Sequence, residues 1–130
     1  MSSLVGEVKR FVVEEVGNVE EFLRLLAPES RVHYELYWRA LEYSKEFGII
    51  YKIEAGVKFY GITKEGFILV CRLSEVISWD DERLRKYNTG NLFSDYNEWI
   101  KEKWKEFEQK AKELGATPGK FQFAIVGDRA

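Results

Sequence analysis

The chain has 130 residues, of which 45% are hydrophobic and 15% aromatic, and a formal net charge of −2. This composition is too apolar for a disordered segment and is sufficient for a single domain over residues 1–130. The weak negative charge excludes a protein whose whole surface is basic, so bulk electrostatics give no attraction to nucleic acid. The only cysteine is Cys71, which excludes an intramolecular disulfide and indicates a reducing setting.

The amino-terminal residues do not predict a targeting segment. They lack a basic stretch followed by an apolar stretch, so we expect no signal peptide. No apolar run approaches the roughly 18–20 residues needed to cross a bilayer. We therefore expect a cytoplasmic protein with no membrane contact. The bias toward Lys and Glu, with few Gln and Cys, is typical of hyperthermophile proteins and indicates a thermophilic source.

The first part of the chain predicts three helices. Apolar residues spaced three and four apart predict a helix over residues 3–15. Gly17 then provides a helix stop and Asn18 an N-cap for the second helix. The third helix is the longest of the three; it begins at residue 29 or 30 and ends at Gly48. Its apolar residues follow a four-four-three-four spacing and are Val32, Leu36, Ala40, Tyr43 and Phe47.

The middle of the chain predicts a β-hairpin that is extended to about four antiparallel strands. Residues 49–54 and 57–62 alternate between apolar and polar side chains, with a turn between them at residues 55–56. A tight connection over residues 63–66 carries glycine where a positive φ is wanted. Residues 67–73 are almost all apolar, so we expect a strand that is central in the sheet or covered on both faces.

Residues 74–130 predict a helical extension with a closing strand. A long helix over residues 94–114 carries apolar residues that recur every seven positions. This seam faces either the sheet of its own chain or a partner helix in a homodimer. The candidate residues for a partner contact are Trp99, Ile100, Trp104 and Phe107. Residues 120–126 alternate and then turn apolar, which favours one closing strand.

Three helices followed by a hairpin is the element order of the winged helix. Residues 41–66 resemble the end of the recognition helix and the wing of prokaryotic and archaeal winged helix-turn-helix regulators, and the likeness extends more weakly over residues 5–73. The motif is a leucine-bearing helix that ends at a glycine before two isoleucines, followed by Tyr-Gly-Ile-Thr-Lys-Glu-Gly at residues 60–66. The resemblance implies an α+β fold with three N-terminal helices, a winged-helix-like β-hairpin in about four antiparallel strands, and a long C-terminal helix.

The same resemblance implies a DNA-binding protein, such as a small dimeric transcription regulator whose third helix enters the major groove of double-stranded DNA. The residues implied to contact DNA are Arg31, Tyr34, Trp38, Arg39, Lys45, Lys58 and Lys64. Residues 29–73 are nearly balanced in charge, so a protein–protein interaction module on the same scaffold, with no nucleic acid, is the alternative. Exposed Tyr and Trp beside Arg are typical of protein interfaces.

The sequence offers little chemistry for an enzyme. His33 is the only histidine, which excludes a metal site with two histidine ligands. The acids between Asp80 and Glu98 are the candidates for a divalent ion, but adjacent acids at a helix start are usually capping residues. We expect a protein that is not an enzyme and has no cofactor and no metal.

Overall fold

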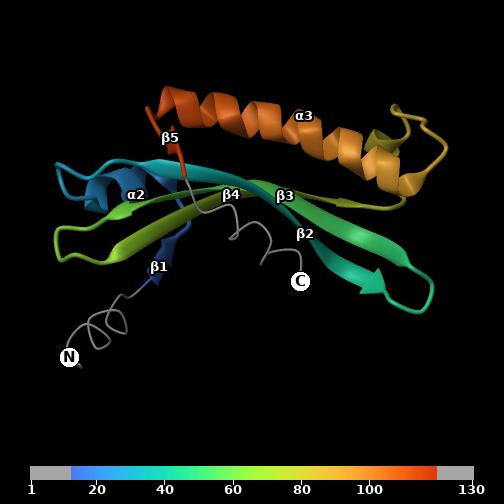
Figure 1. Ribbon diagram of the computed structural model, residues 1–130, viewed down its shortest axis with the longest axis horizontal. Coiled ribbons are helices and arrows are strands. Elements are labelled where there is room, and N and C mark those ends of the chain that lie inside the picture. The colour runs from blue at the N-terminus through green and yellow to red at the C-terminus, as the bar shows by residue number, and fades with distance from the viewer. Residues whose placement is uncertain (1–12, 120–130) are drawn as a thin grey trace.

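The computed structural model describes residues 13–119 of the chain. These residues form a five-stranded mixed sheet with the strand order β1-β4-β3-β2-β5, together with two α-helices and one 3-10 helix (Figure 1). In chain order the elements are β1 (Val13–Val16), α2 (Val19–Leu25), β2 (His33–Ser44), β3 (Ile49–Ile62), β4 (Ile68–Ser78), η1 (Glu82–Leu84), α3 (Leu92–Glu113) and β5 (Thr117–Pro118).

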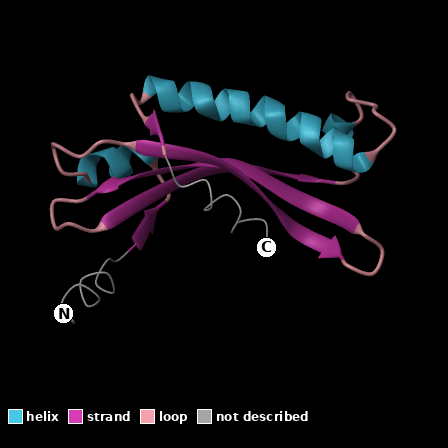
Figure 2. Ribbon diagram, viewed as in Figure 1, coloured by secondary structure: helices cyan, strands magenta, loops and turns pink. Residues whose placement is uncertain are grey.

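The centre of the sheet is an antiparallel meander of β2, β3 and β4, whose strands have 11 to 14 residues. The two outer strands are short and run parallel to their neighbours, β1 beside β4 and β5 beside β2. The long helix α3 lies along one face of this sheet (Figure 2). Within residues 13–119 no helix covers the opposite face, so the described part of the chain has two layers.

The core lies between the helices and the sheet in two clusters. Trp99 and Ile100 of α3 pack against Ile53 and Ile77 of the sheet in one cluster. In the other cluster Phe22 of α2 joins residues of the sheet and the last turns of α3, which places α2 on the same face as α3. The buried members of this second cluster are Phe22, Leu26, Tyr34, Val57, Phe59, Leu69, Cys71 and Ala111. Burying a large apolar side chain of this kind stabilises the fold by roughly 1.5–3 kcal/mol.

The expected arrangement of three N-terminal helices with a four-stranded antiparallel sheet is wrong. The chain is α+β, but the described residues hold two α-helices and a five-stranded mixed sheet. The predicted third helix is instead the strand β2, and the predicted turn at residues 55–56 lies inside the continuous strand β3. The element order of a winged helix is therefore absent from residues 13–119.

The prediction of a helix where the chain forms β2 was wrong for a physical reason. Residues four apart lie on one face of a helix, but because four is also a multiple of two they lie on one face of a strand as well. Val32, Leu36 and Ala40 fit both patterns. Only the step of three from Ala40 to Tyr43 favours a helix, and β2 has its register shifts between these two residues. These irregularities change the face on which the following side chains lie.

Other expected elements are confirmed. Asn18 caps α2 by accepting a hydrogen bond from the Glu21 amide. The turn over residues 63–66 joins β3 to β4, and the predicted helix over residues 94–114 corresponds to α3 within two residues. Most of the predicted helix over residues 3–15 lies outside the described residues, while residues 13–15 belong to β1. The predicted closing strand over residues 120–126 also lies outside them. No helix within residues 13–119 has the length and apolar character to span a membrane.

Candidate ligand-binding groove

The face of the sheet opposite the helices carries most of the polar side chains of the strands. Residues directly opposed across an antiparallel pair share a face, so Glu35 of β2 and Lys58 of β3 lie together. Their neighbours Val57 and Phe59 point to the other face, where they belong to the core with α3. We call the face that carries Glu35 and Lys58 the open face.

The loop between α2 and β2 bounds one end of the open face. The Ala27 amide donates to the Ile62 carbonyl at 2.9 Å, and the Ile62 amide donates to Ser30 Oγ at 2.9 Å. Gly61 allows this close approach, because a Cβ atom there would lie 2.8 Å from Leu26 Cδ2 and 3.0 Å from Ser30 Oγ. The loop is therefore fastened to the end of β3.

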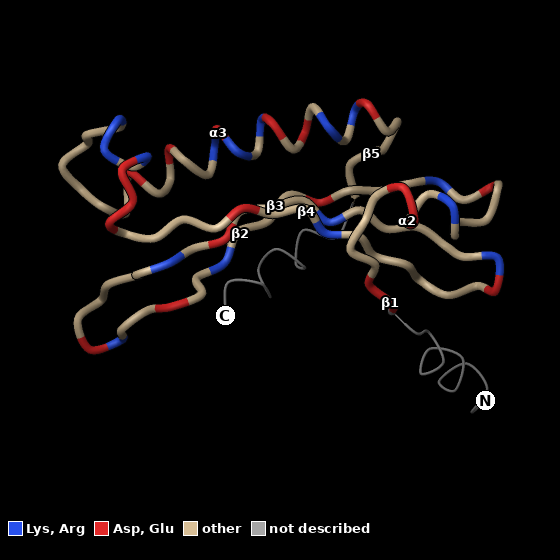
Figure 3. The backbone as a smooth tube through the Cα atoms, turned by 180° about the vertical axis from the view of Figure 1, so that it is seen from behind, with Lys and Arg blue, Asp and Glu red and all other residues tan. Residues whose placement is uncertain are grey.

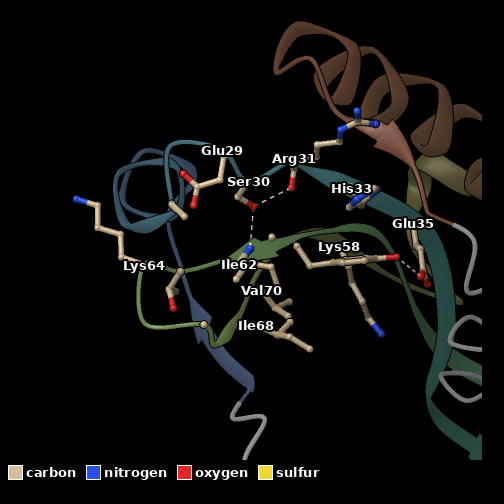
Figure 4. A pocket seen from close by; sticks show the side chains of 15 residues that line it. Glu29, Ser30, Arg31, His33, Glu35, Lys58, Ile62, Lys64, Ile68 and Val70 are labelled. Atoms are coloured by element: carbon tan, nitrogen blue, oxygen red, sulfur yellow. Dashed lines mark hydrogen bonds between the residues drawn. The ribbon is translucent and has the colours of Figure 1, made fainter. Parts of the chain in front are cut away.

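A groove of about 1080 Å³ lies between this loop, the open face and the β3–β4 turn (Figure 4). Its size is close to that of pockets that hold small molecules, roughly 300–1,000 Å³. The larger apolar residues that line it come from β3 and β4 and are Tyr60, Ile62, Ile68 and Val70. The charged residues that line it are Glu29, Arg31, Glu35, Lys58 and Lys64. The groove therefore combines an apolar lining with charged groups.

Glu35 lies at one end of the groove and is only 5% exposed. The Tyr60 hydroxyl donates a hydrogen bond to Glu35 Oε1, whereas Glu35 Oε2 is buried and has no hydrogen-bond partner among the described residues. The His33 ring lies 6.0 Å from the Tyr60 ring, and its Nδ1 is 3.1 Å from Thr117 Oγ1. Burial and the hydrogen bond to Glu35 raise the pKa of Tyr60, so this phenol remains a donor at neutral pH.

A second polar group lies further along the open face and consists of Tyr37, Arg39, Glu54 and Arg72, which we call the Glu54 cluster. The Tyr37 hydroxyl donates to Glu54 Oε2, and Arg39 Nε donates to Glu54 Oε1 at 2.9 Å. Burial opposes the ionisation of Glu54, but the hydrogen bonds from Tyr37 and Arg39 outweigh it and lower the pKa of this carboxyl. Both carboxylate oxygens of Glu54 thus have a donor, in contrast to those of Glu35.

Arg72 connects the Glu54 cluster to the outer strand. Its guanidinium lies 5.0 Å from the centroid of the Tyr37 ring, at cation–π distance. Its Nε is 3.5 Å from Glu15 Oε2 on β1. The cluster therefore links four adjacent strands on the open face, which is the role of a structural network.

The residues predicted to contact DNA do not share one surface. Three of them line the groove, namely Arg31, Lys58 and Lys64. The other four are Arg39 in the Glu54 cluster, Tyr34 and Trp38 on the helix-covered face, and Lys45 in the β2–β3 turn. Figure 3 shows acidic and basic residues interspersed along the strands instead of gathered into one basic stripe.

The residues predicted to contact a partner lie between α3 and its own sheet. Trp99 is 2% and Ile100 is 6% exposed, both buried in the core. Trp104 is half-buried and donates from Nε1 to the Tyr37 carbonyl at 2.9 Å, and Phe107 packs at the edge of the core. The apolar seam of the helix thus faces the sheet of its own chain, and a homodimer through residues 94–114 stays a prediction.

The acids between Asp80 and Glu98 do not form a metal site. Asp81 caps η1 and pairs with Arg83, and these hydrogen bonds lower the pKa of Asp81 to about 2. Asp95 accepts hydrogen bonds from Thr89. Across residues 13–119 no three side chains of His, Cys, Asp or Glu lie together in a way that could hold a metal ion.

The sequence patterns did not predict the end of the groove formed by Glu35 and Tyr60. A helix over this region places Glu35 among side chains three and four residues away, whereas the strand places it opposite β3. The alternation of polar His33, Glu35 and Arg39 with apolar residues at positions 34, 36 and 38 indicates a strand with one polar face. That alternation was the signal for the open face.

Comparisons with protein-family models, with curated proteins and with solved structures found no match to this chain.

Proposed function

We propose that this protein is a ligand-binding protein whose groove on the open face holds the apolar body of a small amphipathic molecule. The observation that carries the proposal is the apolar lining of the groove. Ile62 is 42% exposed there, and Ile68, Val70 and Tyr60 beside it are only partly buried. Covering such side chains on binding contributes about 25 cal/mol for each Å² of apolar surface removed from water.

Two features of the groove support a small ligand. Its wall is fixed by hydrogen bonds between the α2–β2 loop and β3, so the site is largely formed before binding. The charged residues stand around an apolar lining, which suits a molecule with an apolar body and a polar end. The proposal assigns binding and no catalysis to the groove.

The test uses 1-octanol as a probe and follows the methyl resonances of the isoleucines and valines by NMR. We expect the resonances of Ile62, Ile68 and Val70 to shift on titration. Those of Ile53 and Ile77, which are 1% exposed in the core, should stay in place. Absence of any shift at the groove methyls would overturn the proposal.

A matched pair of variants makes the test specific. Ile62 and Val76 are both 42% exposed and both lie on the open face, but only Ile62 lines the groove. We expect Ile62→Glu to weaken octanol binding at least about tenfold, because a charge on the apolar lining must be desolvated, and Val76→Glu to leave it unchanged. Equal losses in both variants would contradict binding in the groove.

Binding of double-stranded DNA stays a prediction of the sequence resemblance alone. The same protein can be titrated with random-sequence duplex DNA at about 50 mM salt, where contacts to phosphate are strong. The interspersed charges in Figure 3 lead us to expect no measurable complex. A complex that weakens steeply with added salt would favour the DNA-binding alternative.

A further inference from the structure

Glu35 is the one carboxylate in the groove that is both buried and incompletely hydrogen-bonded. The residue is 5% exposed, and its Oε2 atom has no partner in the part of the chain that the structure describes, while Oε1 accepts from the Tyr60 hydroxyl. A buried carboxylate oxygen without a donor costs free energy, because it has lost water and gained nothing in return. A ligand that supplies a donor at this atom would remove that cost.

Within residues 13–119, the donors near Glu35 are directed elsewhere. Tyr60 has one hydroxyl hydrogen, and it already points to Oε1. The Lys58 amine lies over the Tyr37 ring, 5.4 Å from its centroid, and His33 Nδ1 is within hydrogen-bond distance of Thr117 Oγ1. In Figure 4 the Lys64 side chain extends away from the Glu35 carboxylate. Glu35 Oε2 therefore remains for a ligand.

We propose that the polar end of the amphipathic ligand is a primary ammonium group, which donates a hydrogen bond to Glu35 Oε2. This inference rests on the proposed function of the groove. A charged donor to a carboxylate forms a hydrogen bond roughly twice as strong as a neutral donor does. A carboxylate or phosphate head would present acceptor oxygens to an atom that itself needs a donor.

Three probes with the same eight-carbon body separate the head groups, namely octylammonium, 1-octanol and octanoate. We expect octylammonium to bind at least about tenfold more tightly than octanol, the ratio that separates a charged from a neutral hydrogen bond, and octanoate to bind most weakly. The methyl resonances of Ile62, Ile68 and Val70 report all three titrations.

Glu35→Gln tests which residue causes the preference. The amide keeps the size of the side chain and removes its charge, so we expect octylammonium and octanol to bind this variant within about threefold of each other. Glu29→Gln is the matched control, because Glu29 also lines the groove but lies on the α2–β2 loop. This control should keep the preference of the wild type.

Tyr60→Phe keeps the test decisive if Glu35→Gln fails to fold. It leaves the Glu35 carboxylate in place and removes its one donor, so the preference for octylammonium should persist or increase.

The outcomes distinguish a failure of the ammonium head group from a failure of the groove as a binding site. Equal binding of octylammonium and octanol by the wild type would overturn the ammonium head and leave the groove standing as a binding site. Loss of the preference in Glu29→Gln to the same extent as in Glu35→Gln would also overturn it, because the cause would then be the overall charge. Failure of all three probes to shift the groove methyls would overturn the proposed function itself.

Discussion

Gly56 lies in the middle of β3 under the ring of Tyr37, where a side chain has no room. A Cβ atom at this position would lie 2.5 Å from the Leu73 carbonyl oxygen and 2.7 Å from Tyr37 Cε1. Gly56→Ala must therefore displace Tyr37 or β4. We expect it to lower the free energy of unfolding by about 1–3 kcal/mol, the usual cost of overpacking, as measured by urea denaturation.

Gly17→Ala is the control for this prediction. No atom lies within 4 Å of a Cβ built at Gly17, so its substitution should change the stability by less than about 0.5 kcal/mol. Similar losses in the two variants would show that the close approach of Tyr37 is not what requires glycine in β3.

Glu54 makes the stability of the sheet depend on pH. Hydrogen bonds from Tyr37 and Arg39 outweigh the effect of burial and hold the pKa of Glu54 below its ordinary value of 4.5. A carboxyl with a lower pKa in the folded state stabilises the fold above its unfolded pKa, and this contribution is lost as the pH falls through the folded pKa. We expect Glu54→Gln to be about 1–3 kcal/mol less stable than wild type at pH 7.

The measurement is the free energy of unfolding of both proteins at acid pH. The difference in unfolding free energy between wild type and Glu54→Gln should shrink as the pH is lowered below about 4.5. Glu65→Gln, in the exposed β3–β4 turn, should show no such change between pH 7 and pH 3. A difference for Glu54→Gln that is constant with pH would mean that the charge of Glu54 does not stabilise the Glu54 cluster.

At the scale of elements, the sequence predicted those that are determined by local chemistry. The helix α2 has an N-cap at Asn18, the β3–β4 turn has Gly66 with a φ of +91°, and α3 has a long apolar seam. Each of these features acts within a few residues of the chain, so a single sequence is enough to find it.

The strand β2 depends on distant partners and was therefore not predicted. Its conformation is fixed by pairing with β3 along most of its length and by the Trp104 hydrogen bond from α3. Local spacing at Val32, Leu36 and Ala40 agrees with both a helix and a strand, so tertiary pairing decides between them. For the same reason, the groove was not predicted. Arg31, Lys58 and Lys64 were predicted only as contacts to DNA, and Glu35 becomes part of the site only when β2 is a strand.

The helix α3 offers a direct comparison of a buried and an exposed aromatic residue. Trp99 is 2% exposed against the sheet, whereas Phe93 near the start of the helix is 62% exposed. We expect Trp99→Ala to lower the free energy of unfolding by about 3–5 kcal/mol, because it leaves a large cavity in the core. Phe93→Ala should change it by less than about 0.5 kcal/mol.

Chemical denaturation and mass measurement in solution together check this prediction. If α3 served mainly as a dimer helix, Trp99→Ala would lower the oligomeric mass while the unfolding free energy of the monomer stayed near that of wild type. That result would restore the partner role that the sequence assigned to Trp99 and contradict the packing on the sheet.

Over the whole molecule, buried and paired tyrosines link stability to alkaline pH. Burial is the largest cause of a raised pKa in all five of them, and an acidic neighbour raises the pKa of each further. The five residues are Tyr34, Tyr37, Tyr60, Tyr87 and Tyr96. The pKa of Tyr96, which faces the charge of Asp80, is raised to about 12. Both faces of the sheet and both ends of α3 contribute to this group.

The sign of the effect follows from the raised pKa. A tyrosine with a higher pKa in the folded state contributes its full stabilisation below its unfolded pKa of about 10, and loses it as the pH rises toward the folded pKa. Between pH 10 and pH 11.5 we expect the unfolding free energy to fall by up to about 1.4 kcal/mol per pH unit for each such tyrosine. Urea denaturation at stepped pH measures the slope, and tyrosinate absorbance of the folded protein measures the native titration.

Tyr60→Phe and Tyr43→Phe provide the comparison. The Tyr60 hydroxyl donates a hydrogen bond to Glu35, whereas Tyr43 is 47% exposed near the end of β2. Removing Tyr60 should lower the alkaline slope by about one proton, whereas removing Tyr43 should leave it unchanged. If the folded protein ionised all its tyrosines near pH 10, as the unfolded chain does, the slope would vanish. That result would contradict the hydrogen bond from the Tyr60 hydroxyl to Glu35 Oε1. It would also contradict the assignment of Glu35 Oε2 as the acceptor for a ligand.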